Sequence, residues 1–220
     1  MTTLSEASFT CACCGATSEG MVLASTNAFG SMDLDMRPPP MQRDTLDQQI
    51  RQCPECGYCS PDLEDAKGID PAVVHGRDYQ STLTDPGYPP LARRFLAYAH
   101  LAAVAEDHRS TAWAMLRAAW VCDDQGAEYV DQSAACRNRV GEALYGLHAQ
   151  GESFTNDQQT DGILRLDLLR RAGRFDEAIA EASRLQATQL PDILGKIAAF
   201  QALLARDRDV GCHTVSEVLG

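Results

Sequence analysis

The sequence is poor in lysine and contains no stretch rich in basic residues. Only Lys67 and Lys196 are lysines among its 19 basic residues, and 31 acidic residues give a net charge of −12. Proteins that bind duplex nucleic acid need a basic surface to neutralise phosphates. The composition therefore argues against binding of duplex DNA or RNA.

Long apolar runs and targeting signals are also missing. No uncharged apolar stretch approaches the roughly 18 residues that a membrane helix requires. Residues 1–10 lack both a basic segment and the apolar segment that follows it in a secretory signal. We therefore expect a cytoplasmic protein without membrane contact, and the 45% of apolar residues is enough for a packed core.

Familiar catalytic motifs are absent as well. The sequence has no G-x-S-x-G, no Walker loop, no H-E-x-x-H and no G-x-G-x-x-G. Its five histidines are scattered, and His100 is expected to pack within a helical bundle. Asp33, Asp35 and Arg37 lie two residues apart on an expected strand, so they share one face, which we interpret as solvated with a local ion pair. These observations favour a protein that is not an enzyme.

Proline and alanine divide the chain near residue 90. Nine of ten prolines lie at or before Pro90, whereas 24 alanines follow that residue and seven precede it. Proline opposes helix interiors and alanine favours them. We therefore predict a loop-rich module with short strands over residues 1–90 and an all-helical domain over residues 91–220.

The second half shows one-sided apolar stripes with helical spacing. They predict six helices, around residues 91–102, 113–120, 129–147, 163–169, 175–185 and 191–204, with a polar break at 151–161. The segment 168–182 resembles the hairpin of the tetratricopeptide repeat, with Gly173 at the turn and Ala178 as the small residue. Residues 95–120 resemble a second, weaker hairpin, and an ordinary helical bundle is the alternative for both.

The strongest motif is a pair of C-x-x-C-G sequences, at Cys11 to Gly15 and Cys53 to Gly57. Each C-x-x-C brings two sulfurs to one metal, and the glycine permits the positive φ of a knuckle turn. Two such knuckles predict a zinc ribbon, and the proposed ligands of its one structural Zn²⁺ are Cys11, Cys14, Cys53 and Cys56. In the first knuckle Cys13 is the alternative ligand.

The cysteine pattern has two other interpretations. Cys53, Cys56 and Cys59 begin an iron–sulfur run, but Leu63 stands at the fourth position. A thioredoxin-type dithiol is a further alternative, although no βαβ pattern surrounds it. The cysteines outside the proposed ligand set are interpreted mainly as packing residues, with Cys13 and Cys59 as the alternative free thiols near the metal.

The knuckles, the D-x-D-x-R-P stretch at 33–38, CPECGY at 53–58, LRAAW at 116–120 and GRFDEA at 173–178 together resemble one bacterial family, domain of unknown function 2225. The resemblance covers nearly the whole chain. It implies a zinc ribbon followed by tetratricopeptide-like helices, and it implies no activity or substrate.

The first hypothesis for function is a non-enzymatic scaffold that binds a protein or peptide partner. If the hairpin has repeat geometry, Asp167, Arg170 and Arg171 face the binding groove. A thiol-based redox or metal sensor is the second hypothesis. The third is binding of single-stranded nucleic acid by the ribbon, which five basic against 13 acidic groups in residues 1–90 disfavour.

Overall fold

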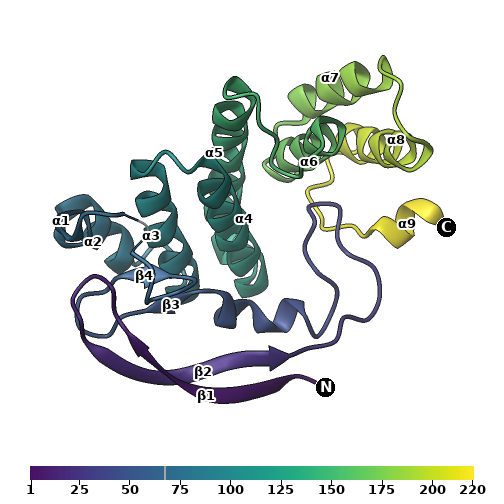
Figure 1. Ribbon diagram of the computed structural model, residues 1–220. Helices are drawn as coiled ribbons and strands as arrows, with labels where there is room; N and C mark the ends of the chain where they lie inside the picture. The colour runs from purple at the N-terminus through teal and green to yellow at the C-terminus, as the bar shows by residue number, and fades with distance from the viewer. Residues whose placement is uncertain (67) are drawn as a thin grey trace.

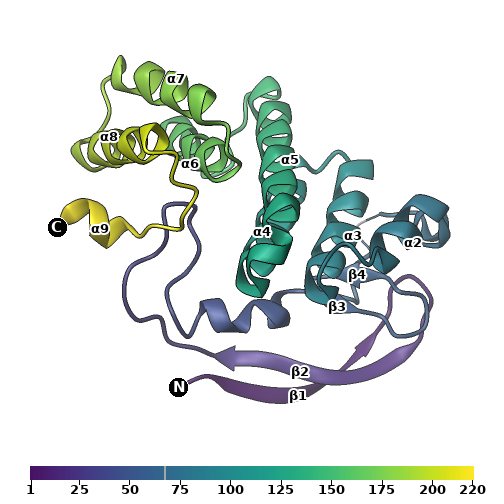
Figure 2. The same cartoon turned by 180° about the vertical axis from the view of Figure 1, so that it is seen from behind.

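The computed structural model describes residues 1–66 and 68–220 (Figure 1). Its first part contains a long β-hairpin, a 3-10 helix, a short two-stranded sheet and two short helices. These elements are β1 (Thr3–Thr10), β2 (Thr17–Ser25), η1 (Arg43–Gln49), β3 (Arg51–Gln52), β4 (Cys59–Ser60), α1 (Pro71–His75) and α2 (Arg77–Thr84). Both sheets are antiparallel, and Thr10 pairs with Thr17 at the turn of the hairpin. In Figures 1 and 2 the hairpin runs beneath the helices, away from α7.

Helices make up the second part. They are α3 (Pro90–Val104), α4 (His108–Gln125), η2 (Ala127–Tyr129), α5 (Val130–Ala149), α6 (Gln158–Arg171), α7 (Phe175–Gln186), α8 (Asp192–Arg206) and α9 (Val215–Leu219). The six predicted helices correspond to α3–α8, although α6 begins inside the segment that was expected to be a polar break. The prediction of a mainly helical protein is confirmed.

Local sequence explains where several helices begin and end. The side chain of Asp107 accepts a hydrogen bond from the Ser110 N–H and caps α4, and Asp157 does the same for α6. Gly126, with φ of 97°, ends α4. Gly173, with φ of 74°, makes the turn between α6 and α7, and Ala178 is fully buried in the hairpin. This agrees with a tight helical hairpin, while the repeat type of the array remains a prediction.

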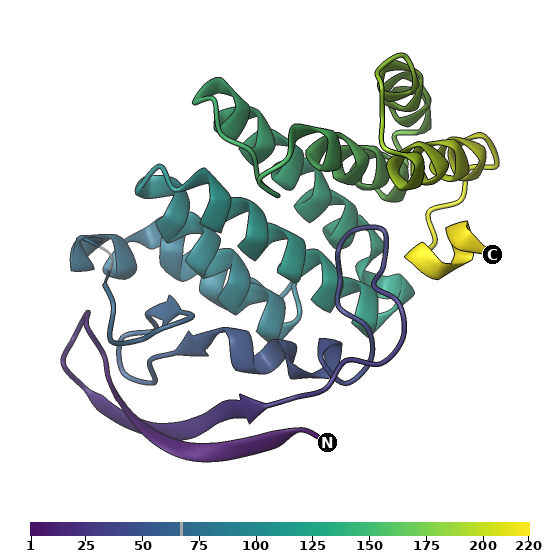
Figure 3. The ribbon, with the colours of Figure 1, turned by 45° about the vertical axis from the view of Figure 1, so that its right-hand side comes forward.

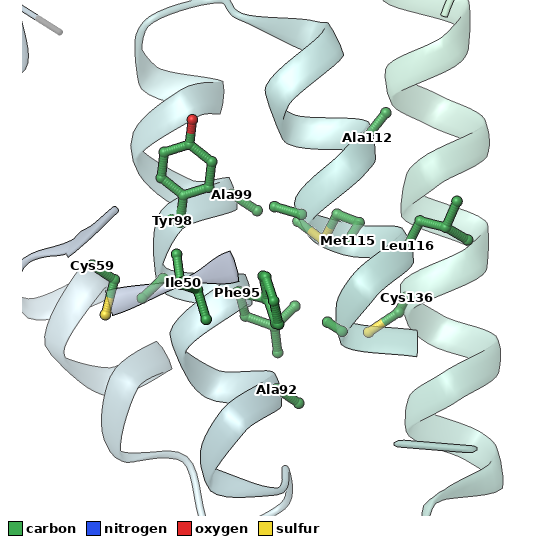
Figure 4. Packing of buried hydrophobic residues seen from close by; sticks show 14 of the residues in the cluster. Ile50, Cys59, Ala92, Phe95, Tyr98, Ala99, Ala112, Met115, Leu116 and Cys136 are labelled. Atoms are coloured by element: carbon green, nitrogen blue, oxygen red, sulfur yellow. The ribbon is translucent and has the colours of Figure 1, made fainter. Parts of the chain in front are cut away.

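One hydrophobic cluster joins the N-terminal part to α3–α5. Ile50, Cys59 and Tyr79 are almost completely buried in it, together with Phe95 from α3 and Met115 from α4. Figure 4 shows Ile50 between Cys59 and Phe95. The predicted boundary at residue 90 is therefore not a break in the packing.

A second cluster lies between α6, α7 and α8, and it includes Leu34 from the long connection after β2. That connection reaches across the protein to the C-terminal segment, as Figure 3 shows. Leu34 N–H donates to the His213 carbonyl at 2.9 Å, and Val215 N–H donates to the Met32 carbonyl at 2.9 Å. The N-terminal chain thus packs on the last helices as well as on the first ones.

Candidate metal centre and buried charge network

The first knuckle is the turn between β1 and β2. Cys11 N–H donates to the Ala16 carbonyl at 2.9 Å, and Gly15 N–H donates to the Cys11 carbonyl at 2.8 Å. Gly15 has φ of 74°, a conformation that side chains with a Cβ adopt rarely. The turn places Cys11 and Cys14 at the same end of the hairpin.

The second knuckle connects β3 to β4 and repeats this geometry. Cys53 N–H donates to the Tyr58 carbonyl at 2.8 Å, Gly57 N–H donates to the Cys53 carbonyl at 3.0 Å, and Gly57 has φ of 77°. A Cβ at Gly57 would also lie only 2.8 Å from Leu83 Cδ2. Both features favour glycine at this position.

The two knuckles meet, and their four sulfurs form one cluster. The Sγ atoms of Cys11, Cys14, Cys53 and Cys56 all lie within 4.8 Å of one another. Sγ of Cys11 lies 3.7 Å from that of Cys56, and Cys14 is equally far from Cys53. The Ala12 N–H donates to the Leu63 carbonyl at 2.8 Å, which holds the first knuckle against the chain that follows the second.

This arrangement fits one tetrahedral metal ion. For a Zn–S bond of about 2.3 Å, the sulfurs of a tetrahedron are roughly 3.8 Å apart. Four thiolates are also a donor set that zinc prefers in structural sites. The four cysteines can therefore hold one metal ion, and the expectation of a four-cysteine cluster in the N-terminal part is confirmed.

The pKa values of the clustered cysteines shift in opposite directions. Burial raises the pKa of Cys11 and Cys56. It also acts to raise the pKa of Cys53, but hydrogen bonds from the Cys56 and Glu55 backbone and from neighbouring thiols outweigh it, and the pKa is lowered. Backbone N–H groups that point at sulfur stabilise a thiolate, as a metal site requires.

Cys59 and Cys13 lie outside the group of four. Cys59 is fully buried, and burial raises the pKa of its thiol to about 12. Its backbone N–H donates to the Tyr79 hydroxyl at 2.9 Å, and this hydroxyl donates to the Gly57 carbonyl at 2.9 Å. Tyr79 thus ties α2 to the second knuckle. Cys13 is half-buried against the same hydrophobic cluster.

The interpretation of Asp33, Asp35 and Arg37 as a solvated strand face is wrong, because all three side chains are buried. Asp35 Oδ2 accepts hydrogen bonds from Trp120 Nε1 at 2.9 Å and from the Arg171 guanidinium at 2.6 Å. The Arg137 guanidinium lies 3.3 Å from the same oxygen. Asp35 therefore connects α4, α5 and α6 through one carboxylate.

Asp123 from α4 completes this network. Its carboxylate lies 2.7 Å from the guanidinium of Arg137 and 2.7 Å from that of Arg171, and it accepts a hydrogen bond from Ser133. Burial acts to raise the pKa of Asp123, but the two arginines outweigh it, so the pKa lies below the ordinary value. Nothing in the sequence pattern indicated that these distant residues meet.

Asp167, Arg170 and Arg171 do not face an exposed groove. Asp167 is 1% and Arg170 0% exposed, and they form an ion pair of 2.8 Å inside the protein. Arg170 also donates to the carbonyls of Asp209 and Gly211. The placement expected from repeat geometry is wrong because the connection after β2 and the segment after α8 cover this face of α6.

The remaining cysteines and histidines do not extend the metal centre. Cys122 and Cys136 are buried in α4 and α5, as expected for packing residues. Cys212 is exposed, and His213 lies 3.1 Å from Asp209 and 2.8 Å from Glu217. His213 is thus held by the two carboxylates of its own segment.

The chain matches no known family model, and no characterised protein or solved structure is significantly similar to it. The resemblance to domain of unknown function 2225 therefore stays a prediction. Within the described part of the chain, no helix is long and apolar enough to cross a membrane.

Proposed function

We propose that this protein is a non-enzymatic scaffold whose N-terminal part is held together by one structural zinc ion. The observation that carries the proposal is the convergence of four Sγ atoms within 4.8 Å of one another. The ligands are Cys11 and Cys14 from the first knuckle and Cys53 and Cys56 from the second. Four cysteine ligands fill a tetrahedral site, so no position is open for substrate or water.

The part of the chain around the knuckles has little other support. Most side chains of β1 and β2 are exposed or half-buried, and β3 and β4 have two residues each. A hairpin with so small a buried face is marginal in water. Zinc supplies a crosslink between the knuckles here, and apparent binding free energies of such sites are about 10–16 kcal/mol.

The same part of the chain also supports the helices. Cys53 and Cys59 belong to the hydrophobic cluster that includes Phe95. Tyr79 fixes α2 to the second knuckle through two hydrogen bonds. The zinc site thus stabilises the base on which α3 and α4 pack, and the helical surface remains available for a protein or peptide partner.

Metal analysis of the purified protein tests this proposal. We expect about one zinc per chain, and we expect Cys11→Ser or Cys56→Ser to lose it. Cys13→Ser is the matched control, because Cys13 lies in the same knuckle outside the group of four. Full zinc in the Cys11→Ser and Cys56→Ser proteins, or iron with a visible absorption band in the wild type, contradicts the proposal.

The sensor hypothesis has less support. A reactive thiol needs a thiolate that is accessible to its oxidant. Cys59 is fully buried with a raised pKa, and burial also raises the pKa of the half-buried Cys13.

A further inference from the structure

A concave surface lies between α5, α6 and α7, on the helices that the metal centre does not use. It consists of two neighbouring hollows of about 410 Å³ and about 260 Å³. Gly141, Tyr145 and Arg165 line both hollows and therefore lie where the two join. We call this surface the α5–α7 groove.

Gly141 opens the groove at a cost to helix stability. It lies inside α5, where glycine is less favourable than alanine because it loses more backbone freedom on folding. A Cβ at Gly141 would meet no atom within 4 Å, so close packing does not require glycine there. Gly162 in α6 differs, because a Cβ there would lie 2.6 Å from Leu185 Cδ2. Because Gly141 has no side chain, the space where the two hollows meet stays open.

Arg165 presents its charge at this junction. Its guanidinium stacks on the Tyr145 ring at 4.8 Å from the centroid and donates to the Tyr145 hydroxyl at 2.9 Å. Tyr145 is 61% exposed, which is high for a large aromatic side chain. Among residues 1–66 and 68–220, no carboxylate oxygen lies within the 4.0 Å ion-pair distance of Arg165.

The other exposed arginines of the groove are already paired. Arg174 forms an ion pair with Glu177 at 2.6 Å, and Arg184 forms one with Glu181 at 2.7 Å. The lining of the two hollows has four arginines and four acidic residues, on a chain whose net charge is −12. The groove is thus close to neutral. The arginine at its centre forms no ion pair within the described chain, although its charge helps to lower the pKa of nearby Glu177.

We infer that the α5–α7 groove binds an extended segment of a partner protein through an internal glutamate or aspartate that pairs with Arg165. This inference rests on the proposed scaffold function and names the chemistry of its partner. The fixed planar fork of a stacked guanidinium matches a carboxylate with two hydrogen bonds. Tyrosine and arginine are also the residues that contribute most often to binding hot spots.

The position of Arg165 selects an internal acidic residue over a chain end. A terminal carboxylate at the junction would leave one of the two hollows empty, whereas a continuing chain fills both. In the larger hollow, the buried side chains of Leu144 and Leu185 provide an apolar contact for a neighbouring residue of the segment.

The far side of the larger hollow has a fixed polar group. Asp161 accepts hydrogen bonds from Phe154 N–H, Thr155 N–H and the Thr155 hydroxyl, and its carboxylate lies 3.0 Å from His148 Nε2. Because Asp161 is immobilised by these donors, it orients the half-exposed imidazole at the groove. His148 then offers its other ring nitrogen to the backbone of the bound segment.

A peptide array tests the inference. The probes are short peptides with blocked ends and a central glutamate between varied neighbours, each matched by the same peptide with glutamine. Wild-type protein is expected to bind a subset of the glutamate peptides roughly tenfold more tightly than their glutamine partners, since hydrogen bonds between ionised groups are about twice as strong as those between neutral groups.

Two variants and one control locate the binding. Arg165→Gln should remove the preference for glutamate, and Gly141→Leu should abolish binding by filling the junction. Gly195→Leu is the control, because Gly195 lies inside α8, is open to the same degree and lines neither hollow. Absence of any glutamate preference, a preference that survives Arg165→Gln and Gly141→Leu, or binding only of peptides with a free carboxyl terminus overturns the inference.

Zinc content of the same preparations separates the two proposals. One zinc per chain with no peptide binding contradicts the groove and leaves the metal proposal standing. Peptide binding that depends on Arg165 in a protein without zinc contradicts the metal proposal and supports the groove.

Discussion

Replacing Asp35 with asparagine should weaken the protein far more than its place in a connecting loop suggests. Asp35→Asn keeps the size of the side chain but removes the charge that faces Arg171 at 2.6 Å and Arg137 at 3.3 Å. The Asp35 side chain is fully buried, so water cannot replace it. Removal of one partner from a buried ion pair typically costs about 3–5 kcal/mol.

Asp123, the other acid of the network, determines where in this range the loss of unfolding free energy falls. Asp123 still pairs with both arginines in the variant, and asparagine keeps an oxygen for Trp120 Nε1. We therefore expect a loss near the lower end, about 3 kcal/mol of unfolding free energy. Asp192→Asn is the control, since the side chains of Asp192 and Lys196 are 87% and 55% exposed and their ion pair should contribute at most about 1 kcal/mol.

Urea denaturation followed by circular dichroism measures both losses. A loss of less than about 1 kcal/mol for Asp35→Asn, or equal losses for the two variants, refutes the conclusion that one buried carboxylate joins α4, α5 and α6. If the urea midpoint of α6–α8 in Asp35→Asn equalled that in the wild type, the conclusion would also be contradicted, because the loop that carries Asp35 connects these helices to α4 and α5.

Three further predictions concern the metal, the glycines and acid. Chelation of the metal should lower the thermal midpoint of the helical signal as well as disorder the hairpin, because Cys53 and Cys59 share a core with Phe95; an unchanged midpoint would show that the two parts are uncoupled. Gly141→Ala should raise the unfolding free energy by about 1 kcal/mol, whereas Gly162→Ala should lower it because its methyl meets Leu185, and the same sign for both would refute the packing argument. The pKa of Asp123 is lowered in the folded state, so its contribution to the unfolding free energy is present above the ordinary carboxyl pKa near 4 and is lost as pH falls through the folded value. Urea midpoints from pH 6 to pH 3 should therefore fall less steeply in Asp123→Asn than in the wild type, and equal slopes would contradict the assigned pKa shift.

Local signals in the sequence were sufficient for the knuckles and the helices. The spacing of Cys11 and Cys14, and of Cys53 and Cys56, predicted sulfurs that the structure brings together, because each C-x-x-C-G is a short-range turn. Apolar periodicity predicted α3–α8 for the same reason, since each stripe depends only on neighbours three and four residues away.

Long-range contacts explain what the sequence pattern missed. Asp35 is 136 residues from Arg171, and no local periodicity relates the two. A charged residue on a predicted helix face is usually solvated, so the sequence placed Arg170 at an exposed surface. In the structure the chain after α8 covers it. The run at 71–84 lies in the module that was predicted to be rich in loops, but it forms α1 and α2. Pro71 is compatible with α1 because it occupies the first helical turn, where its missing N–H is not needed.

One sequence feature, the glycine at position 141, weakly indicated the α5–α7 groove. Gly141 interrupts an otherwise helical pattern without a turn, and such a glycine often has a packing or functional reason. Only the three-dimensional arrangement shows that it lines the same hollow as Arg165.

The most direct test of the metal centre compares Cys14→Ser with Cys13→Ser in one metal analysis. These neighbours share a turn and differ in whether their sulfur belongs to the group of four within 4.8 Å. The account predicts about one zinc per chain in the wild type and in Cys13→Ser, and loss of the metal in Cys14→Ser. Zinc retained by Cys14→Ser and lost by Cys13→Ser would contradict it.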